Sequence, residues 1–196
     1  MKTTISRRDF LQMTAIGTGS LFLLPGCFRM QEVSHWHFFK AEEATVLESI
    51  IEQIIPTDEW PGAKSAGVAV FIDRQLTGPY TRFRDTYRNG LAAVTSSCME
   101  LFSKPFQNLS FDEQTDFLKA MEFGKTAFLQ KDGSLGNTAN PVWKDELDKT
   151  FFSLVRDHSM QGFYGSPRHG GNQNYISYRM IGLDYPLIIG QNRYKK

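Results

Sequence analysis

Apolar residues recur at intervals of three and four positions along most of the chain, and this spacing most narrowly limits its fold. Residues 41–55 read AEEATVLESIIEQII, in which glutamates interrupt a stripe of alanine, leucine and isoleucine. This pattern is typical of one buried face of an α-helix. Pro56 predicts where it ends, because the residue before a proline disfavours the helical conformation. No useful stretch alternates with the period of two that a half-buried strand needs. We therefore predict an all-α fold.

Three further helices are predicted in the middle of the chain. Apolar side chains at helical intervals indicate two of them, over residues 65–76 and 83–101. The third begins at Ser110, because Ser110 and Glu113 have the spacing of a capping box. In that motif the hydroxyl accepts a backbone N–H of the first turn and the carboxylate accepts the N–H of the serine. The helix should then continue to about Phe123.

A loop and a final helix are predicted before the C-terminal segment. Residues 131–141 indicate the loop, and Asn140 followed by Pro141 predicts an N-cap and first turn of a helix that ends near His158. Residues 161–196 are rich in glycine, asparagine, proline and tyrosine, and their aromatic content argues against disorder. The predicted fold class is all-α: a single helical domain with a long irregular Gly/Tyr-rich C-terminal segment, preceded by a signal peptide.

The N-terminal stretch SRRDFLQ, residues 6–12, resembles the twin-arginine export signal, which directs folded proteins to a dedicated translocase. It departs from that signal at Gln12, where lysine is commoner. The apolar residues 13–24 that follow are too few to span a bilayer, which takes about 20 residues. We therefore expect residues 1–26 to form a signal peptide. Its targeting residues are Arg7, Arg8, Phe10 and Leu11.

The stretch LPGC, residues 24–27, resembles a bacterial lipobox, in which the cysteine is acylated and the bond before it is cut. Several acyl chains on one residue anchor a protein far more firmly than a single chain does. We expect Cys27 to be the lipidation site, with residues 27–40 as anchor and tether of a domain at 41–196. The expected location is the periplasm, with the protein lipid-anchored to a membrane. Simple cleavage nearby, which would leave a soluble protein, is the alternative.

Charge and cysteine content narrow the function further. The full chain has 22 basic and 21 acidic residues, and loss of the signal peptide leaves 19 and 20. This balance gives no reason to expect nucleic acid as a partner. The chain has two cysteines, so acylation of Cys27 leaves Cys98 without a disulfide partner. Cys98 lies on the apolar face of a predicted helix, and we expect its thiol to be buried.

Motifs for a bound cofactor are missing from the sequence. There is no G-x-G-x-x-G after a strand for a dinucleotide and no C-x-x-C-H for covalent haem. Asp58 and Glu59 could act as paired carboxylates, but Asp58 is more often a residue that accepts backbone N–H groups in a turn. Zinc would need further ligands beyond a pair of histidines. None is evident around the four histidines: His35, His37, His158 and His169. We predict no catalytic, cofactor-binding or metal residues in this chain.

Two stretches together resemble the gluconate 2-dehydrogenase subunit 3 family: IIPTDEWPGAKSAGVAVFID, residues 54–73, and GFYGSPRHGGNQNYISYRMIGLDYP, residues 162–186. With the helices between them, the resemblance covers most of the mature chain. It implies a non-catalytic small subunit that pairs with a large FAD-dependent subunit of the glucose–methanol–choline (GMC) oxidoreductase class. The large subunit would hold the FAD, oxidise a sugar, sugar acid or glycoside, and pass electrons to a c-type cytochrome.

The resemblance also accounts for the export signal. In the family the small subunit commonly carries the twin-arginine signal and the large one often lacks it, which implies that the large subunit is exported as a passenger. The expected partners are thus the large subunit, the twin-arginine translocase, a cytochrome and, through the lipid, a membrane. This chain departs from the family at Tyr178, where tryptophan is common, and at residues 182–184, which read Gly-Leu-Asp instead of Gly-Phe-Pro. These departures leave the sugar unidentified.

Residues 162–186 are the predicted partner-binding surface. Their glycines let the backbone follow a surface closely, and their aromatic side chains supply large contacts with a polar tip. Folding of this segment over the protein's own helices is the alternative, and both can hold together. The residues predicted to bind the partner are Phe163, Tyr164, Pro167, Arg168, His169, Gly170, Gly171, Asn172 and Tyr178.

Two other functions stay open from the sequence. The chain could act alone as a periplasmic lipoprotein, either an enzyme or a ligand-binding protein, with a pocket built from Arg168, His169 and Asn172. It could instead be an export chaperone that leaves its partner after delivery. The WPG sequence at residues 60–62 is a second candidate contact, for which a structural turn is the alternative.

Overall fold

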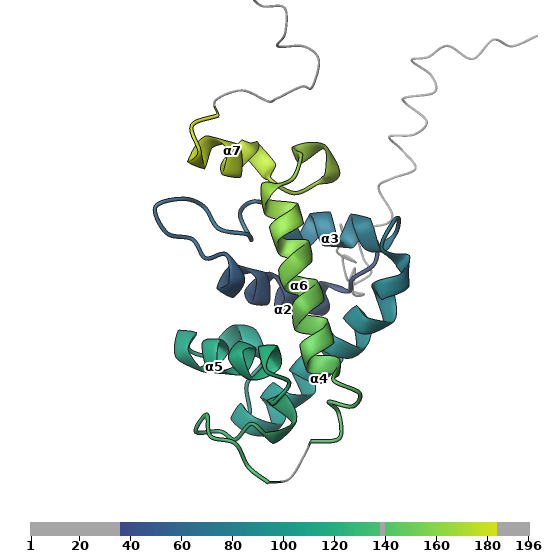
Figure 1. Ribbon diagram of the computed structural model, residues 1–196, viewed down its shortest axis with the longest axis vertical. Coiled ribbons are helices and arrows are strands. Elements are labelled where there is room, and N and C mark those ends of the chain that lie inside the picture. Colours follow the sequence, from purple (N-terminus) through teal and green to yellow (C-terminus); the bar gives the residue numbers. More distant parts are fainter. Residues whose placement is uncertain (1–35, 138–139, 184–196) are drawn as a thin grey trace, which may run out of the picture. The chain divides into compact units, whose positions relative to one another are not determined.

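Helices are the regular secondary structure of the residues that the structure describes, 36–137 and 140–183 (Figure 1). The structure is a computed structural model of the chain. Within these two ranges there is no strand, and Leu129 and Leu135 form an isolated antiparallel bridge. The all-α prediction is confirmed. The residues predicted for targeting and lipidation lie outside the described ranges: Arg7, Arg8, Phe10, Leu11 and Cys27.

The predicted helices over residues 41–55, 83–101 and 110–123 are confirmed to within two residues. The helix expected at residues 65–76 begins later, at Val68, because Gly67 has a φ of 70° that a helix does not accept. None of the helices in the described ranges is both long and apolar enough to span a bilayer. The α-helices are α2 Ala41–Ile54, α3 Val68–Leu76, α4 Arg84–Phe102, α5 Phe111–Glu122, α6 Leu147–Tyr164 and α7 Ile176–Met180.

The start of α5 has the capping box that its sequence predicts. The backbone N–H of Glu113 donates to Ser110 Oγ at 3.3 Å, and the N–H of Ser110 donates to Glu113 Oε2 at 2.7 Å. The hydrogen bonds from Ser110 lower the pKa of Glu113, because they stabilise its charged form. Local residues therefore define this helix terminus without help from distant parts of the chain.

The predicted start of α6 at Asn140 and Pro141 is wrong. Asn140 instead forms a turn, in which its side-chain oxygen accepts the N–H of Val142 at 3.0 Å. The buried indole of Trp143 then donates to Ser97 Oγ on α4 at 2.8 Å. This tertiary hydrogen bond fixes residue 143 against α4 in a non-helical conformation. The helix therefore begins only at Leu147. It also continues past His158, the predicted end, to Tyr164.

The core forms where α6 packs against α2, α3, α4 and α5. Gly90 on α4 faces the ring of Phe151 on α6, and a Cβ at this position would lie 2.3 Å from that ring. A larger residue would therefore push the two helices apart. Cys98 is fully buried, as predicted, and burial raises the pKa of its thiol to about 12. The thiol is therefore neutral and packs as a small apolar group.

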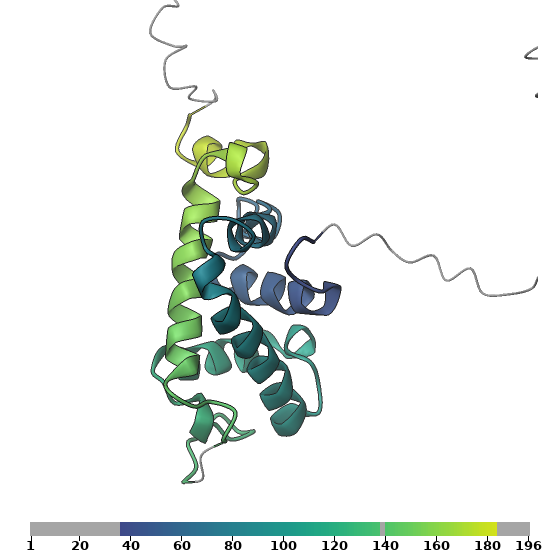
Figure 2. The same cartoon turned by 90° about the vertical axis from the view of Figure 1, so that its right-hand side faces the viewer.

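Of the C-terminal segment predicted to be irregular, residues 161–183 are described and residues 184–196 lie outside the described ranges. Residues 161–164 complete α6, and residues 165–183, here called the cap, contain two short 3-10 turns followed by α7. The cap lies next to the C-terminal half of α6 and close to α3, whereas α5 packs on the N-terminal half of α6 (Figures 1 and 2). The two halves of α6 thus belong to two different ends of the helical body.

Candidate functional site

A groove of about 410 Å³ lies at the end of the body that carries the cap. One wall comes from α3 and the turn after it, and the other comes from the last turns of α6 and the start of the cap. Met160 and Tyr164 lie one helical turn apart on α6, and their side chains are 46% and 50% exposed. The residues that line this cap groove are Phe71, Gln75, Tyr80, Met160, Gln161, Tyr164, Gly165 and His169.

Tyr80 connects the groove to the core beneath it. Its ring stacks on the imidazole of His158, with 4.3 Å between the ring centroids and 16° between the planes. Its hydroxyl donates a hydrogen bond to the side-chain oxygen of Gln161. The ring of Phe71 packs edge-to-face against the ring of Tyr80, with 6.5 Å between the ring centroids. These contacts fix the position of the phenol ring, so one wall of the groove is preformed.

His158 is a buried polar residue below this wall, with 4% of its surface exposed. Burial lowers the pKa of His158 to about 4; the negative charge of Asp157 opposes this shift and the positive charge of Arg82 adds to it. Burial also raises the pKa of Tyr87 well above its ordinary value. Both groups are therefore neutral at pH 7, and 2.9 Å separates the Tyr87 hydroxyl from His158 Nδ1. The pair joins α4 to α6 by an internal hydrogen bond.

Asn172 holds the cap together from inside. It is fully buried, and its φ of 44° is in the left-handed region, which asparagine tolerates better than most residues. Its amide nitrogen donates to the carbonyl of Gly165 at 2.9 Å, and its amide oxygen accepts the N–H of Ser177 at 2.9 Å. Both sides of the amide are thus bonded within the cap, which argues against the ligand pocket of Arg168, His169 and Asn172 considered from the sequence.

Glycine at position 171 permits the close approach of the cap to α6. A Cβ at Gly171 would lie 2.2 Å from the carbonyl oxygen of Gly162. The N–H of Gln173 also donates to the carbonyl of Ala66 at 2.9 Å, which joins the cap to the turn before α3. The cap is therefore packed on the protein's own helices, as one of the two sequence interpretations expected.

The residues predicted to bind a partner fall into two groups. Those that are buried in this chain support the cap, and those that are exposed form its outer surface. Tyr164, Arg168 and His169 are exposed, and two of them, Tyr164 and His169, line the cap groove. Pro167 and Tyr178 are half-buried. The buried members are Phe163, Gly170, Gly171 and Asn172.

Residues 36–39, here called the strap, are fastened to the body just before α2. Asp73 on α3 is buried, and its carboxylate accepts the backbone N–H groups of His37, Phe38 and Phe39 at 2.8 to 3.0 Å. Arg88 on α4 pairs with Glu43, donates to the Phe38 carbonyl and lies 4.3 Å from the centre of the Phe38 ring. The sequence assigned these residues to the tether, and the pattern gave no sign of Asp73 as their partner.

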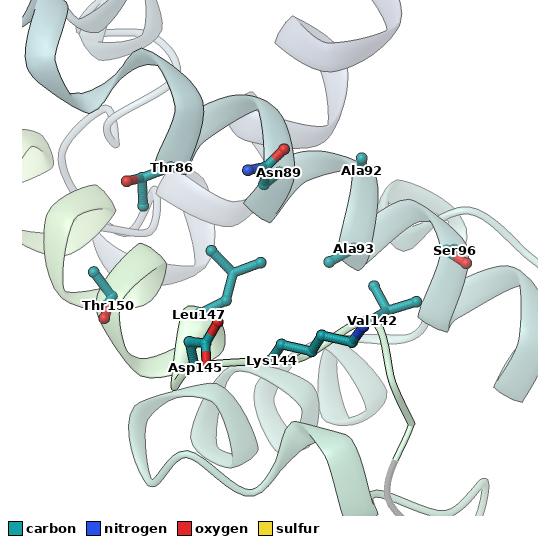
Figure 3. Close-up of a pocket in the computed structure, with 10 residues that line it drawn as sticks. All are labelled: Thr86, Asn89, Ala92, Ala93, Ser96, Val142, Lys144, Asp145, Leu147 and Thr150. Atoms are coloured by element: carbon teal, nitrogen blue, oxygen red, sulfur yellow. The ribbon is translucent and has the colours of Figure 1, made fainter.

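A second and larger groove, of about 640 Å³, lies between α4 and the segment that leads into α6 (Figure 3). The α4 wall presents small side chains such as Ala92 and Ser96, and the opposite wall carries Lys144 and Asp145. This lining offers one amine and one carboxylate, with no histidine or cysteine. None of the predicted site residues lies here, and the lining gives no arrangement for acid–base or nucleophilic chemistry.

The other residues considered as functional candidates from the sequence take part in local turns. Asp58 accepts the N–H of Trp60 at 2.8 Å, which confirms its predicted role in a turn. A Cβ at Gly62 would lie 2.6 Å from the carbonyl oxygen of Ile55, so the WPG sequence forms a tightly packed turn. Within residues 36–137 and 140–183, no three histidine, cysteine, aspartate or glutamate side chains are grouped as metal ligands would be.

The sequence pattern did not indicate the stack of Tyr80 on His158 or the exposure of Met160. A helix prolonged by two turns past residue 158 would have placed Met160 and Tyr164 on one face, which was the available signal. In a comparison with known protein families, the family model described as gluconate 2-dehydrogenase subunit 3 matches residues 41–184. No curated protein and no solved structure matches the chain.

Proposed function

Because the chain belongs to the gluconate 2-dehydrogenase subunit 3 family, we propose that it is the non-catalytic small subunit of a dehydrogenase complex and binds its large subunit through the cap. The observation that supports this role most directly is the convergence of Tyr164 and His169, both predicted as partner contacts, on one preformed groove. Around them, buried residues hold the cap in place, so the exposed side chains are presented on a rigid base. Such pre-organisation reduces the entropy lost on binding.

The chemistry of the cap groove suits a protein partner. Tyrosine and methionine are enriched in protein interfaces. Tyrosine buries a large area at a low cost in conformational entropy, and methionine adapts its shape to an irregular surface. Gln75 and Gln161 add amide groups at the walls, and His169 adds a ring nitrogen. The groove therefore offers an apolar centre with polar groups around it, which is the usual composition of an interface centre.

The finer features of the complex are part of the same proposal. The large subunit is a GMC-type flavoprotein that holds FAD and oxidises a sugar, sugar acid or glycoside, with a c-type cytochrome as electron acceptor. The signal at Arg7 and Arg8 exports the assembled pair by the twin-arginine route. Cys27 then anchors the complex to a membrane from the periplasmic side. The sequence motifs and the family support these features.

The role of the cap is tested by co-purification of the tagged chain with its flavoprotein subunit. The double change Tyr164→Ala and His169→Ala should reduce the flavin recovered with the chain at least about tenfold, which corresponds to ~1.4 kcal/mol of binding. Phe111→Ala is the control, since Phe111 is an exposed aromatic residue on α5, 66% exposed against 50% for Tyr164. Unchanged recovery with a folded double variant would contradict the proposed binding surface.

The export role is tested separately by Arg7→Lys and Arg8→Lys. The flavoprotein subunit should then remain in the cytoplasm, because its partner no longer carries a readable signal. Normal flavoprotein yield in the periplasm would contradict this part of the proposal. Cells with the wild-type signal separate a lasting subunit from a transient export chaperone: a subunit co-elutes with the flavoprotein after export, whereas a chaperone is recovered alone.

A further inference from the structure

The end of the body that carries the cap has an unusual set of charged residues. Residues 68–83 and 158–183, here called the arginine end, contain four arginines and no lysine. The one carboxylate in these ranges belongs to Asp73, which is buried and bonded to the strap. The other charged residues of these two ranges are all arginines: Arg74, Arg82, Arg168 and Arg179.

The opposite end of α6 has the reverse composition. Residues 103–150, here called the lysine end, contain six lysines, eight carboxylates and no arginine. Lysine carries a strongly hydrated charge on a flexible stem and is depleted from protein interfaces. Arginine is less strongly hydrated and is enriched there, because its planar fork can hold a carboxylate by two hydrogen bonds. The two ends thus have the compositions of a solvent-facing surface and of a binding surface.

Arg74 and Arg168 lie near each other at the cap. The guanidinium of Arg74 packs over Gly170, which follows Arg168 and His169 in the chain. A Cβ built at Gly170 would lie 3.0 Å from Nη1 of Arg74. The Nε of Arg168 donates to Ser166 Oγ at 3.2 Å. None of the ion pairs found among the described residues includes Arg74, Arg168 or Arg179. Their charge is therefore available to an outside acceptor.

We propose that the arginine end binds an acidic segment of the large subunit. Carboxylates of this segment pair with Arg74, Arg168 and Arg179, and an apolar side chain beside them enters the cap groove between Met160 and Tyr164. This inference rests on the proposed function, and it adds the chemistry of the partner surface. Basic charges that have no internal partner raise the rate of encounter with an acidic partner and exclude basic ones.

A protein segment fits the observations better than a lipid surface. The cap groove has one wall that Tyr80 makes rigid, and such a site selects a particular side chain. A bilayer surface offers mobile headgroups and asks only for charge and exposed apolar area. Anionic lipid is nevertheless the competing source of negative charge, so the experiment includes it as a separate arm.

The test measures binding of the purified chain to its purified flavoprotein subunit at about 50 mM and about 300 mM NaCl. Wild-type affinity should fall markedly between the two, because salt screens charges over about 10 Å at 0.1 M. The triple change Arg74→Gln, Arg168→Gln and Arg179→Gln should weaken binding at least tenfold at low salt and remove most of the salt dependence. Exchange of the same three residues for lysine should restore the salt dependence and only part of the affinity.

The matched control is the triple change Lys119→Gln, Lys125→Gln and Lys131→Gln, which removes the same charge from the lysine end. It should alter the affinity less than twofold. Equal weakening by both triple variants would overturn the inference while leaving the proposed function intact. No binding of the flavoprotein by the wild-type chain at either salt concentration would instead contradict the proposed function itself.

The lipid arm uses vesicles of phosphatidylcholine with phosphatidylglycerol and the chain without its acyl group. The expected result is no binding that depends on the three arginines. If the arginine-to-glutamine variant lost vesicle binding but kept its full affinity for the flavoprotein, the arginine end would face lipid and the inference would be wrong. The three side chains are exposed, so each variant should unfold at the wild-type temperature, which is checked first.

Discussion

The arginine end and the lysine end are held together by different means. At the lysine end, α5 begins with a local capping box and packs on α6 through apolar residues such as Phe117. At the arginine end, much of the backbone is irregular, and the buried side chains of Asp73 and Asn172 form hydrogen bonds to it. A surface that must present fixed side chains on irregular backbone needs such internal bonds, because unpaired buried backbone groups are costly.

Both ends contain residues with positive φ, and here too they differ. Asp145 and Glu146 at the lysine end have φ of 54° and are exposed, with α6 beginning directly after them. Asn172 and Gly170 at the arginine end have φ of 44° and 102° and are buried. The strain at the first pair can relax into solvent, whereas at Asn172 it is maintained by the packing of the cap. Gly170 adopts its positive φ without strain.

The largest expected effect is the loss of stability of the arginine end in acid. His158 has a folded-state pKa of about 4, below the value of about 6.5 for an unfolded histidine. Between these values His158 is protonated in the unfolded state and neutral in the folded state. The free energy of unfolding therefore falls as the pH falls from about 6.5 to 4. The linkage corresponds to a loss of about 3 kcal/mol in the free energy of unfolding.

This expectation is checked by urea unfolding of the wild type and of His158→Gln at pH 7.5 and pH 4.5. The variant should lose less stability between the two pH values, since glutamine does not titrate. His169→Gln, at an exposed histidine of the same end, is the control and should keep the wild-type acid loss. If the wild type and His158→Gln lost the same unfolding free energy between the two pH values, the buried imidazole would not be the cause of the acid sensitivity.

The second effect concerns the carboxylate that fastens the strap. Asp73→Asn keeps the shape of the side chain but removes the charge that three backbone N–H groups share. Hydrogen bonds to a charged group contribute more than neutral ones, and we expect a loss of about 2 kcal/mol in the free energy of unfolding. Hydrogen exchange should also become faster at residues 37–39.

The comparison for Asp73 is Asp132→Asn at the lysine end, where an exposed carboxylate accepts the N–H and hydroxyl of Ser134. This change should leave the unfolding midpoint almost unaltered, because water replaces the lost bonds. Slow exchange of the strap amides in Asp73→Asn would indicate that the strap is held mainly by its aromatic side chains.

The parts of the fold that follow from local sequence were predicted correctly. The capping box at Ser110 and the stripes of α2 and α4 depend on residues within one or two turns, which a pattern records. The start of α6 was misplaced because the bond between Trp143 and Ser97 joins residues 46 positions apart. Asp73 was missed for the same reason, since its partners lie 34 to 36 positions earlier.

The candidate site was predictable only in its exposed, aromatic half. Tyr164 and His169 were identified from composition and family resemblance, and both line the cap groove. Tyr80 reaches the groove from a turn 81 positions before Gln161, its hydrogen-bond partner, and no local pattern indicates that approach. The sequence also does not show which glycines and aromatic rings face inward. It therefore could not separate the predicted residues that are buried in this chain from those that are exposed.

A smaller effect is expected from the capping box of the lysine end. Ser110→Ala removes the hydroxyl that accepts the N–H of Glu113 and should cost about 1 kcal/mol of unfolding free energy. Ser110→Asp is the control and should retain most of the stability, since aspartate is an equally good N-cap. Binding to the flavoprotein should be unchanged in both variants; weaker binding would mean that the lysine end also contributes to the interface.

The smallest effect is expected at Lys119, on the exposed face of α5. Its amine lies 3.9 Å from Asp116 one turn earlier, and both side chains are more than half exposed. Such surface pairs contribute little because water screens them, so Lys119→Gln should change the unfolding free energy by less than about 0.5 kcal/mol. Arg168→Gln removes the same charge from the arginine end and should change the unfolding free energy equally little; urea unfolding measures both variants.

The two variants should then differ in one respect: only the arginine change should weaken binding to the flavoprotein. If both proved neutral for binding, the contrast between the ends would be one of internal construction alone, with no consequence for partner choice.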